Sequence, residues 1–282
     1  MKTIKKIFFL ALILGFTAYI LGYRFQSKKH KLDHYPMIFA HRGVKNYYPE
    51  NSKEAFQLAE QLGFRAIETD VTVTKDHYPI VFHDDNCKRL IGIDTLIKDV
   101  DYAFLKDKYL LFNGKKTTNQ VLLLSEFVKS IQKDKTIYLD IKTPDKQLAD
   151  SIIKILNDNG KYSTTLIADD NIFFLGYLKY NNPEIRTVLE GFNKGKEFLH
   201  YIIPQKYQTD FYSSFFAEVD SNHVGFLTRN NLTQNKIVYG IDKSNIDFLI
   251  NSGLKNVIIN FDSSMIDYNH ILHKLKNSKI VK

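Results

Sequence analysis

Three short apolar runs in the first third of the chain each end in side chains that titrate or bind anions. The first and third runs occupy residues 37–40 and 79–82, and the second ends at Ile67. The polar residues that follow these runs are His41, Arg42, Glu68, Asp70, His83 and Asp84. Strand ends hold catalytic groups rigidly, and parallel α/β barrels carry their active sites there. We therefore expect these side chains to meet in one cleft.

Strand-like and helix-like segments alternate along most of the chain, which is typical of α/β proteins with parallel strands and right-handed crossovers. The expected strands are 37–40, 66–70, 71–74, 79–82, 136–141, 165–168, 185–189, 210–213, 224–227, 236–239 and 256–260. The expected helices are 53–62, 121–131, 145–159, 171–180 and 245–252. Residues 84–117 and 192–230 are less regular. Roughly eight strands in a domain of about 250 residues fit a (β/α)8 TIM barrel over residues 36–282.

An uncharged apolar segment, residues 7–23, lies near the N-terminus. At a rise of about 1.5 Å per residue it just reaches across a hydrocarbon core of about 30 Å. It follows a basic segment, residues 1–6, and precedes a basic tether, residues 24–35. We expect an uncleaved transmembrane anchor here, because no small-x-small cleavage site follows. A cleaved signal peptide and a buried core helix are the alternatives.

The net charge of +8 is concentrated beside this segment. Residues 1–31 contain seven Lys or Arg and no acid, which leaves 32 basic and 31 acidic residues in residues 32–282. A nearly neutral body argues against a nucleic-acid partner and favours a membrane partner for the basic terminus. The only cysteine is Cys87, so no intramolecular disulfide forms. The sequence does not indicate an oligomeric state.

Three carboxylates point to a metal site. Glu68 and Asp70 alternate on one strand, so they share a face, and Asp140 ends a later strand. Three converging carboxylates repel one another unless a divalent cation or shared protons offset their charge, and oxygen ligands suit Mg²⁺ or Ca²⁺. The alternative is a solvated strand face, but Ile67 and Val71 indicate that this strand is buried.

Two histidines, His41 and His83, each follow an apolar strand. A histidine titrates near neutral pH and serves as an acid or a base. Acid–base catalysis of hydrolysis needs one group to activate the attacking oxygen and another to protonate the leaving oxygen. The two histidines can fill these roles, and a structural role is the alternative for each.

Two basic residues near the same strand ends can bind phosphate. Arg42 offers paired N–H donors, and Lys142 lies two residues beyond Asp140 on the same strand face. The alternatives are a salt bridge from Arg42 to Glu68 or Glu50 and a plain surface role for Lys142. We expect Glu50 and Asn51 to order the loop beneath Arg42. Asn51 can also cap a helix or reach the metal.

Six short pieces occur in an order that resembles the glycerophosphodiester phosphodiesterase family. They are His41-Arg42-Gly43, Pro49-Glu50-Asn51-Ser52, Glu68-x-Asp70-Val71, Thr74-Lys75-Asp76, Val81-Phe82-His83-Asp84 and Leu139-Asp140-Ile141-Lys142. The close resemblance covers residues 37–142. It implies a metal-dependent enzyme of lipid and glycerol metabolism that hydrolyses glycerophosphodiesters to sn-glycerol 3-phosphate and an alcohol. From the apolar segment 7–23, and not from the resemblance, we expect a single-pass protein of a bacterial cell membrane with the catalytic domain on the outer or periplasmic face.

The resemblance assigns roles to nine residues. They are His41 and His83 as catalytic groups, Arg42 and Lys142 on the phosphate, Glu68, Asp70 and Asp140 on one Mg²⁺ or Ca²⁺, and Glu50 and Asn51 in support. His41 is the expected base and His83 the expected acid. In two places the chain departs from the family pattern. Asp140 stands where the family usually has glutamate, and residues 238–240 replace a region that usually carries tryptophan.

Three other functions remain open at this point. A membrane-tethered lysophospholipase D or a phospholipase C-like enzyme would act on lipids with related chemistry. A catalytically inactive barrel that serves as a binding or scaffold protein belongs to a different class. Retention of both histidines and of the early carboxylates argues against the inactive barrel.

Overall fold

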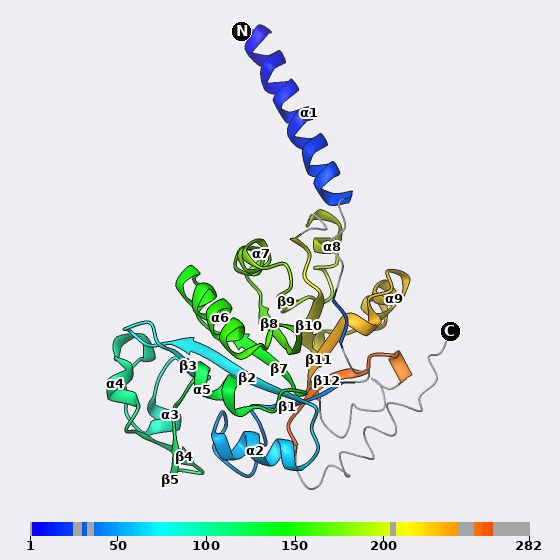
Figure 1. Cartoon of the computed structure of the whole chain (residues 1–282). Coiled ribbons are helices and arrows are strands. Elements are labelled where there is room, and N and C mark those ends of the chain that lie inside the picture. Colours follow the sequence, from blue (N-terminus) through cyan, green and yellow to red (C-terminus); the bar gives the residue numbers. More distant parts are fainter. Residues whose placement is uncertain (1, 25–29, 33–36, 204–206, 242–250, 262–282) are drawn as a thin grey trace.

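The computed structural model describes residues 2–24, 30–32, 37–203, 207–241 and 251–261. Within these residues eight parallel strands close into a barrel, because β1 pairs with both β2 and β12 (Figure 1). In order around the barrel they are β1 (Ile38–His41), β2 (Ala66–Val73), β7 (Thr136–Ile141), β8 (Thr165–Asp169), β9 (Arg186–Leu189), β10 (Phe211–Phe215), β11 (Lys236–Ile241) and β12 (Asn256–Ile259). The predicted TIM barrel is confirmed.

Helices cover the outside of the barrel and follow the strands in sequence (Figure 1). They are α2 (Lys53–Gln61), α5 (Leu124–Ser130), α6 (Lys146–Asn159), α7 (Ile172–Asn181), α8 (Leu199–Ile202) and α9 (Ser221–Arg229). The irregular stretch after β2 adds β3 (Pro79–Val81), α3 (Lys88–Ile91), α4 (Tyr102–Leu105), β4 (Tyr109–Phe112), β5 (Lys115–Gln120) and β6 (Leu122–Leu123). Strand β3 pairs antiparallel with β2, and β4 and β5 form a separate hairpin.

One expected strand is wrong, because residues 224–227 lie inside helix α9. Asp220 caps this helix by accepting a hydrogen bond from the His223 backbone N–H. His223, Phe226 and Leu227 are buried at helical spacing. A short apolar run does not separate a strand from a buried helix face, which explains the error. The expected helix 245–252 and tether 24–35 lie largely outside the described residues.

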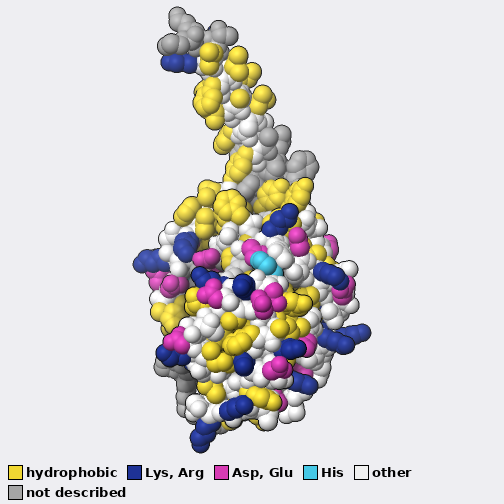
Figure 2. Space-filling model, turned by 90° about the vertical axis from the view of Figure 1, so that its left-hand side faces the viewer, with side chains coloured by type: hydrophobic (Ala, Val, Ile, Leu, Met, Phe, Trp, Pro, Cys, Tyr) yellow, Lys and Arg dark blue, Asp and Glu magenta, His cyan; other side chains and the backbone are white. Residues whose placement is uncertain are grey.

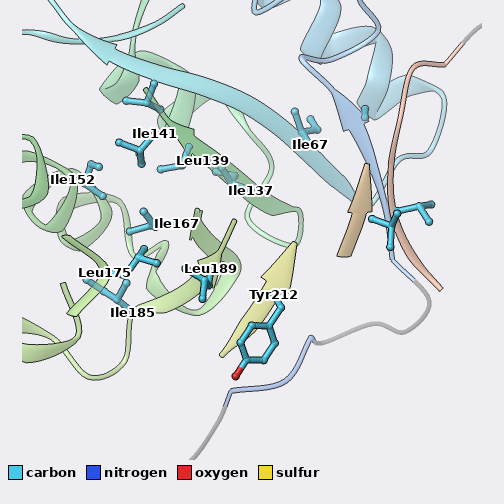
Figure 3. Packing of buried hydrophobic residues seen from close by; sticks show 14 of the residues in the cluster. Ile67, Ile137, Leu139, Ile141, Ile152, Ile167, Leu175, Ile185, Leu189 and Tyr212 are labelled. Atoms are coloured by element: carbon cyan, nitrogen blue, oxygen red, sulfur yellow. The ribbon is translucent and has the colours of Figure 1, made fainter. Parts of the chain in front are cut away.

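Alternation along each strand divides the core into two layers. Ile137, Leu139 and Ile141 of β7 point outward and pack with residues of the surrounding helices such as Ile152 (Figure 3). Tyr138 of the same strand points inward, where it joins a smaller cluster inside the barrel. Because successive side chains point to opposite faces, the last inward position of each strand opens at the carboxyl-terminal mouth.

Helix α1 (Lys2–Arg24) stands apart from the barrel, and its described apolar side chains are exposed (Figures 1 and 2). A membrane span needs about 20 predominantly apolar residues. In the part of the chain that the structure describes, no helix combines the length and the apolar character that crossing a membrane requires. The structure therefore does not support the transmembrane anchor expected at residues 7–23.

The view in Figure 2 shows basic and acidic side chains mixed over the barrel, whereas hydrophobic side chains follow helix α1. On this face no large area carries charge of a single sign. The pattern agrees with the near neutrality of residues 32–282 that the sequence indicates.

Candidate active site

A cavity of about 380 Å³ opens at the carboxyl-terminal ends of the barrel strands. Six of the nine residues that the sequence singled out line it: His41, Arg42, Glu68, His83, Asp140 and Lys142. Asp70 lies beneath it, fully buried. Glu50 and Asn51 contact the site from the loop between β1 and α2. The structure thus brings all nine predicted residues together.

Glu68, Asp70 and Asp140 form a tight carboxylate cluster, with one oxygen of each within 4.8 Å of the others. They lie on the paired strands β2 and β7, with Asp70 opposite Asp140. Burial and then the neighbouring carboxylates raise the pKa of Glu68 well above its usual range, and the pKa of Asp140 also rises. Although aspartate is shorter than the glutamate that the family usually has here, Asp140 reaches the cluster.

Two cations offset part of this charge. Lys142 Nζ lies 2.7 Å from Asp140 Oδ2 and 3.0 Å from Asp70 Oδ1. Arg42 Nε lies 3.0 Å from Asp70 Oδ2. Burial alone would raise the pKa of Asp70, but these two cations outweigh it and hold the pKa below its usual value. The expected surface alternative for Lys142 is therefore wrong.

A left-handed backbone turn positions Arg42. Its φ of 53° directs the backbone N–H to Glu68 Oε2 at 2.8 Å, while the guanidinium bonds to Glu50 Oε1 at 2.9 Å. Gly43 follows, where an added Cβ would lie 2.7 Å from the backbone of Ala55 in α2. The ion pair to Glu50, which was the alternative to phosphate binding for Arg42, is present, and Glu68 binds the backbone of Arg42. The close approach at Gly43 fixes this turn against the helix.

The supporting loop is held by hydrogen bonds that the sequence only partly indicated. Asn51 donates to Asp70 Oδ2 at 2.8 Å and accepts from the Thr69 hydroxyl. It therefore orients a carboxylate of the cluster, whereas Ser52 caps α2. Arg89, which sequence analysis missed, bonds to both oxygens of Glu50. It also binds Asp84, so it ties this loop to the segment after His83.

His41 is oriented by Asn260, whose Oδ1 contacts His41 Nδ1 at 2.5 Å. When Nδ1 donates this hydrogen bond, Nε2 carries the free lone pair. Nε2 lies 3.9 Å from Glu68 Oε2. Burial, with smaller contributions from Lys45 and Arg42, lowers the pKa of His41 to about 4. His41 is thus neutral at neutral pH and suited to accept a proton.

His83 has a different environment. Its Nδ1 lies 2.7 Å from Asp84 Oδ1, and Arg89 in turn binds Asp84. This contact orients the His83 ring, and Arg89 holds Asp84 in place on its other side. His83 also borders a second, more open hollow of about 670 Å³ that is formed with residues 84–86, 88 and 89. The two histidines therefore flank the carboxylate cluster in distinct electrostatic settings.

The wall formed by β9, β10 and β11 carries Glu190 and Phe215, which sequence analysis did not single out, and Tyr239, which lies in the stretch 238–240 where the chain departs from the family pattern. Glu190, Phe215 and Tyr239 line the cavity there, with Tyr138 from β7 beneath. Burial and Asp140 raise the pKa of Glu190 to about 8. The alternation of side chains along a strand indicates both positions. Glu190 lies two residues after Val188 and Tyr239 two residues after Ile237, and both Val188 and Ile237 point into the barrel.

Gly240 lets the Phe215 ring lie across β11. An alanine Cβ at this position would lie 2.0 Å from Phe215 Cε2, and φ is +73°. We expect Gly240→Ala to lower the free energy of unfolding by about 2–3 kcal/mol and to displace Phe215. Urea unfolding measures the loss. Gly114→Ala is the matched control, because φ is +74° there and nothing lies within 4 Å. Equal losses in both variants would contradict the role of Phe215.

Two histidines beside clustered cations and carboxylates can supply the proton transfers and charge stabilisation that cleavage of a phosphoric ester needs. Fold and site together therefore place the chain among the barrel phosphodiesterases. The model of the glycerophosphoryl diester phosphodiesterase family matches residues 41–174. The chain belongs to that family and is by class a phosphodiesterase.

Known proteins resemble the chain over different spans. A glycerophosphodiester phosphodiesterase of Bacillus altitudinis is 46% identical over 69 residues, 24% of this chain and 28% of that protein. An uncharacterized protein of Mycoplasma genitalium is 30% identical over 185 residues, 58% of this chain and 76% of its own length. A solved Oleispira antarctica phosphodiesterase, in complex with its product sn-glycerol-3-phosphate, has a TM-score of 0.73 and 22% identity. That alignment covers 84% of this chain and 97% of that one.

Proposed function

We propose that the chain hydrolyses glycerophosphodiesters to sn-glycerol 3-phosphate and an alcohol with the help of one divalent cation, Mg²⁺ or Ca²⁺. The observation that carries the proposal is the convergence of both histidines, both phosphate-binding cations and three carboxylates at one cavity. The similar fold that holds sn-glycerol-3-phosphate in Oleispira antarctica supports the same product here.

The donor set fits a hard divalent cation. Three carboxylate oxygens lie within 4.8 Å of one another, and burial together with repulsion from the neighbouring carboxylates raises the pKa values of Glu68 and Asp140. A cation at Glu68, Asp70 and Asp140 would relieve that repulsion and stabilise charge on the phosphoryl oxygens. Lys142, which now bridges Asp70 and Asp140, would then be free to contact the phosphate.

The residues of the chain divide the proton transfers between them. His41 Nε2 accepts the proton of the glycerol hydroxyl beside the phosphate as that oxygen attacks phosphorus. His83 donates a proton to the alcohol oxygen as its bond to phosphorus breaks. Water then opens the cyclic phosphate with the two roles exchanged. The neutral His41 and the contact of His83 Nδ1 with Asp84 support this assignment, and Arg42 is placed to bind a phosphoryl oxygen.

A location at the outer face of a membrane stays a prediction. The rival inactive barrel is disfavoured by the intact arrangement of His41, His83 and the carboxylate cluster. No contact of the described residues favours a phospholipase C-like reaction.

The full chain, stripped of metal with a chelator, tests the proposal. It is incubated with glycerophosphocholine or glycerophosphoethanolamine, and released sn-glycerol 3-phosphate is assayed. We expect release only after Mg²⁺ or Ca²⁺ is added. Asp140→Asn is expected to need about 10- to 100-fold more cation, because one charged ligand is lost. Release that continues in the chelator would contradict the metal role, and a folded protein that releases no sn-glycerol 3-phosphate would contradict the activity.

A further inference from the structure

Glu190 faces the catalytic groups from across the barrel. It follows β9, which lies four strands from β1 in the closed sheet, whereas His41 ends β1. The inward position of Val188 places Glu190 inward as well, and Glu190 lines the cavity. The carboxylate is anchored through Oε1, with Tyr138 Oη at 3.2 Å and Ser213 Oγ at 3.5 Å. Its second oxygen, Oε2, is thus left for the cavity.

The environment of Glu190 suits an uncharged hydrogen-bond donor. Among the described residues Glu190 forms no ion pair, and it is half-buried in the wall of the cavity. A polar oxygen enclosed by a cavity is stabilised by a hydrogen-bond donor, so the Oε2 side of Glu190 suits a ligand that brings one. Phe215 and Tyr239, with ring centroids 5.8 Å apart, form the adjoining surface. A short carbon chain that ends in a hydroxyl fits this surface, because the carbons can pack on the two rings while the hydroxyl donates to Glu190.

The proposed reaction decides which end of the substrate reaches this wall. The leaving alcohol must lie beside the proton donor His83, which borders the open hollow formed with Asp84 and Arg89. The glycerol carbons must then extend from the phosphate into the cavity that Glu190 lines. The outermost donor on those carbons is the terminal hydroxyl.

We propose that Glu190 accepts a hydrogen bond from the free terminal hydroxyl of the glycerol moiety and so selects deacylated glycerophosphodiesters over lysophospholipids. This inference rests on the proposed function. An acyl ester at that oxygen has no hydrogen to donate, so the proposed hydrogen bond to Glu190 Oε2 is lost. Sites built to bond a substrate hydroxyl reject analogues that lack it more strongly than apolar pockets do.

Ligand binding tests the subsite independently of turnover. Calorimetry on the full chain with saturating Mg²⁺ or Ca²⁺ compares sn-glycerol 3-phosphate with 2-hydroxypropyl phosphate, which lacks only the terminal hydroxyl. We expect the wild type to prefer sn-glycerol 3-phosphate by about 10- to 100-fold. In Glu190→Ala the preference is expected to fall to about 3-fold or less. Equal weakening of both ligands in this variant would overturn the proposal.

Two further variants control for misfolding and for unspecific effects of removing a carboxylate. Glu190→Gln keeps the shape and one acceptor, so it is expected to retain the fold and an intermediate preference. If Glu190→Ala does not fold, Glu190→Gln becomes the deciding variant. A wild-type preference for sn-glycerol 3-phosphate in Glu190→Gln would then overturn the proposal. Glu184→Ala is the matched control, because Glu184 is exposed before the opposite end of β9. It is expected to leave the preference at the wild-type value.

Turnover separates this inference from the proposed function. The wild type is expected to cleave glycerophosphocholine at least 10-fold more efficiently than its short 1-butanoyl ester, and Glu190→Ala to narrow that ratio. Discrimination that is unchanged in Glu190→Ala would refute the subsite. If neither compound is cleaved but the Glu190-dependent binding preference is present, the proposed function fails and the subsite stands.

Discussion

Alanine at His41 or at His83 is expected to lower the turnover of glycerophosphocholine by about 10²- to 10⁴-fold, because each change removes a proton-transfer group. The double variant is expected to be only slightly slower than the slower single variant, since groups that act in one step are not additive. Release of sn-glycerol 3-phosphate under saturating substrate measures all three. Both side chains are partly exposed, at 26% and 34%, so their truncation leaves the core intact.

The two roles separate when the leaving group is changed. A glycerophosphodiester of p-nitrophenol releases an oxyanion that needs no proton, so it is expected to restore most of the rate of His83→Ala and little of that of His41→Ala. The reverse pattern would show that the acid and base assignments are exchanged. His77→Asn is the control, because His77 is exposed and its φ of 60° is one that asparagine tolerates. It is expected to keep wild-type turnover.

The sequence predicted the carboxylate cluster well because local alternation is enough to place its members. Glu68 and Asp70 share a face by period two, and the pairing of β2 with β7 sets Asp70 opposite Asp140. The same alternation extends to Glu190 and Tyr239, which line the opposite wall. Sequence analysis noted residues 238–240 only as a departure from the family pattern and did not single out Glu190, because this wall depends on closure of the whole barrel and not on a short motif.

Other features follow from contacts that no local pattern contains. The Nδ1 atom of His41 meets Asn260 only because β1 pairs with β12, which lies over 200 residues away in the sequence. Arg42 is held by Glu50 and Asp70 because its backbone adopts a left-handed turn. Helix α9 was mistaken for a strand because its apolar run is too short to reveal a period.

Asp169, at the end of β8, is expected to make the protein less stable as pH rises. Its side chain is 2% exposed, Oδ1 accepts from the Asn171 backbone N–H, and Oδ2 has no hydrogen-bond partner among the described residues. Burial, followed by the charges of Asp170 and Asp140, raises the pKa of Asp169 to about 7 from an ordinary value of 3.8. The folded state therefore holds a proton that the unfolded state has lost.

The sign of the effect follows from proton linkage. Between the unfolded pKa near 4 and the folded pKa near 7 the folded state binds more protons, so the free energy of unfolding falls as pH rises through this window. Above pH 7 the contribution of this group is constant. From pH 5 to pH 8 the loss from Asp169 alone is about 2–3 kcal/mol.

Asp169→Asn is expected to remove this loss. The amide keeps an acceptor for the Asn171 N–H and carries no charge at any pH. The free energy of unfolding of the variant minus that of the wild type should therefore be about 2–3 kcal/mol larger at pH 8 than at pH 5. Urea unfolding of the chelator-treated protein at both pH values measures the difference. Glu190 and Glu68 also have raised pKa values, but they are present in both proteins and cancel.

The neighbouring residue supplies the control for this measurement. Asp170 is exposed, so Asp170→Asn is expected to change stability by less than about 0.5 kcal/mol at either pH. If Asp169→Asn shows the same pH dependence as wild type, Asp169 is ionised in the folded protein at pH 5. Its buried charge would then require a compensating cation beside β8. If Asp170→Asn raised the free energy of unfolding at pH 8 more than Asp169→Asn does, the loss of stability at high pH would come from the exposed Asp170 and not from Asp169.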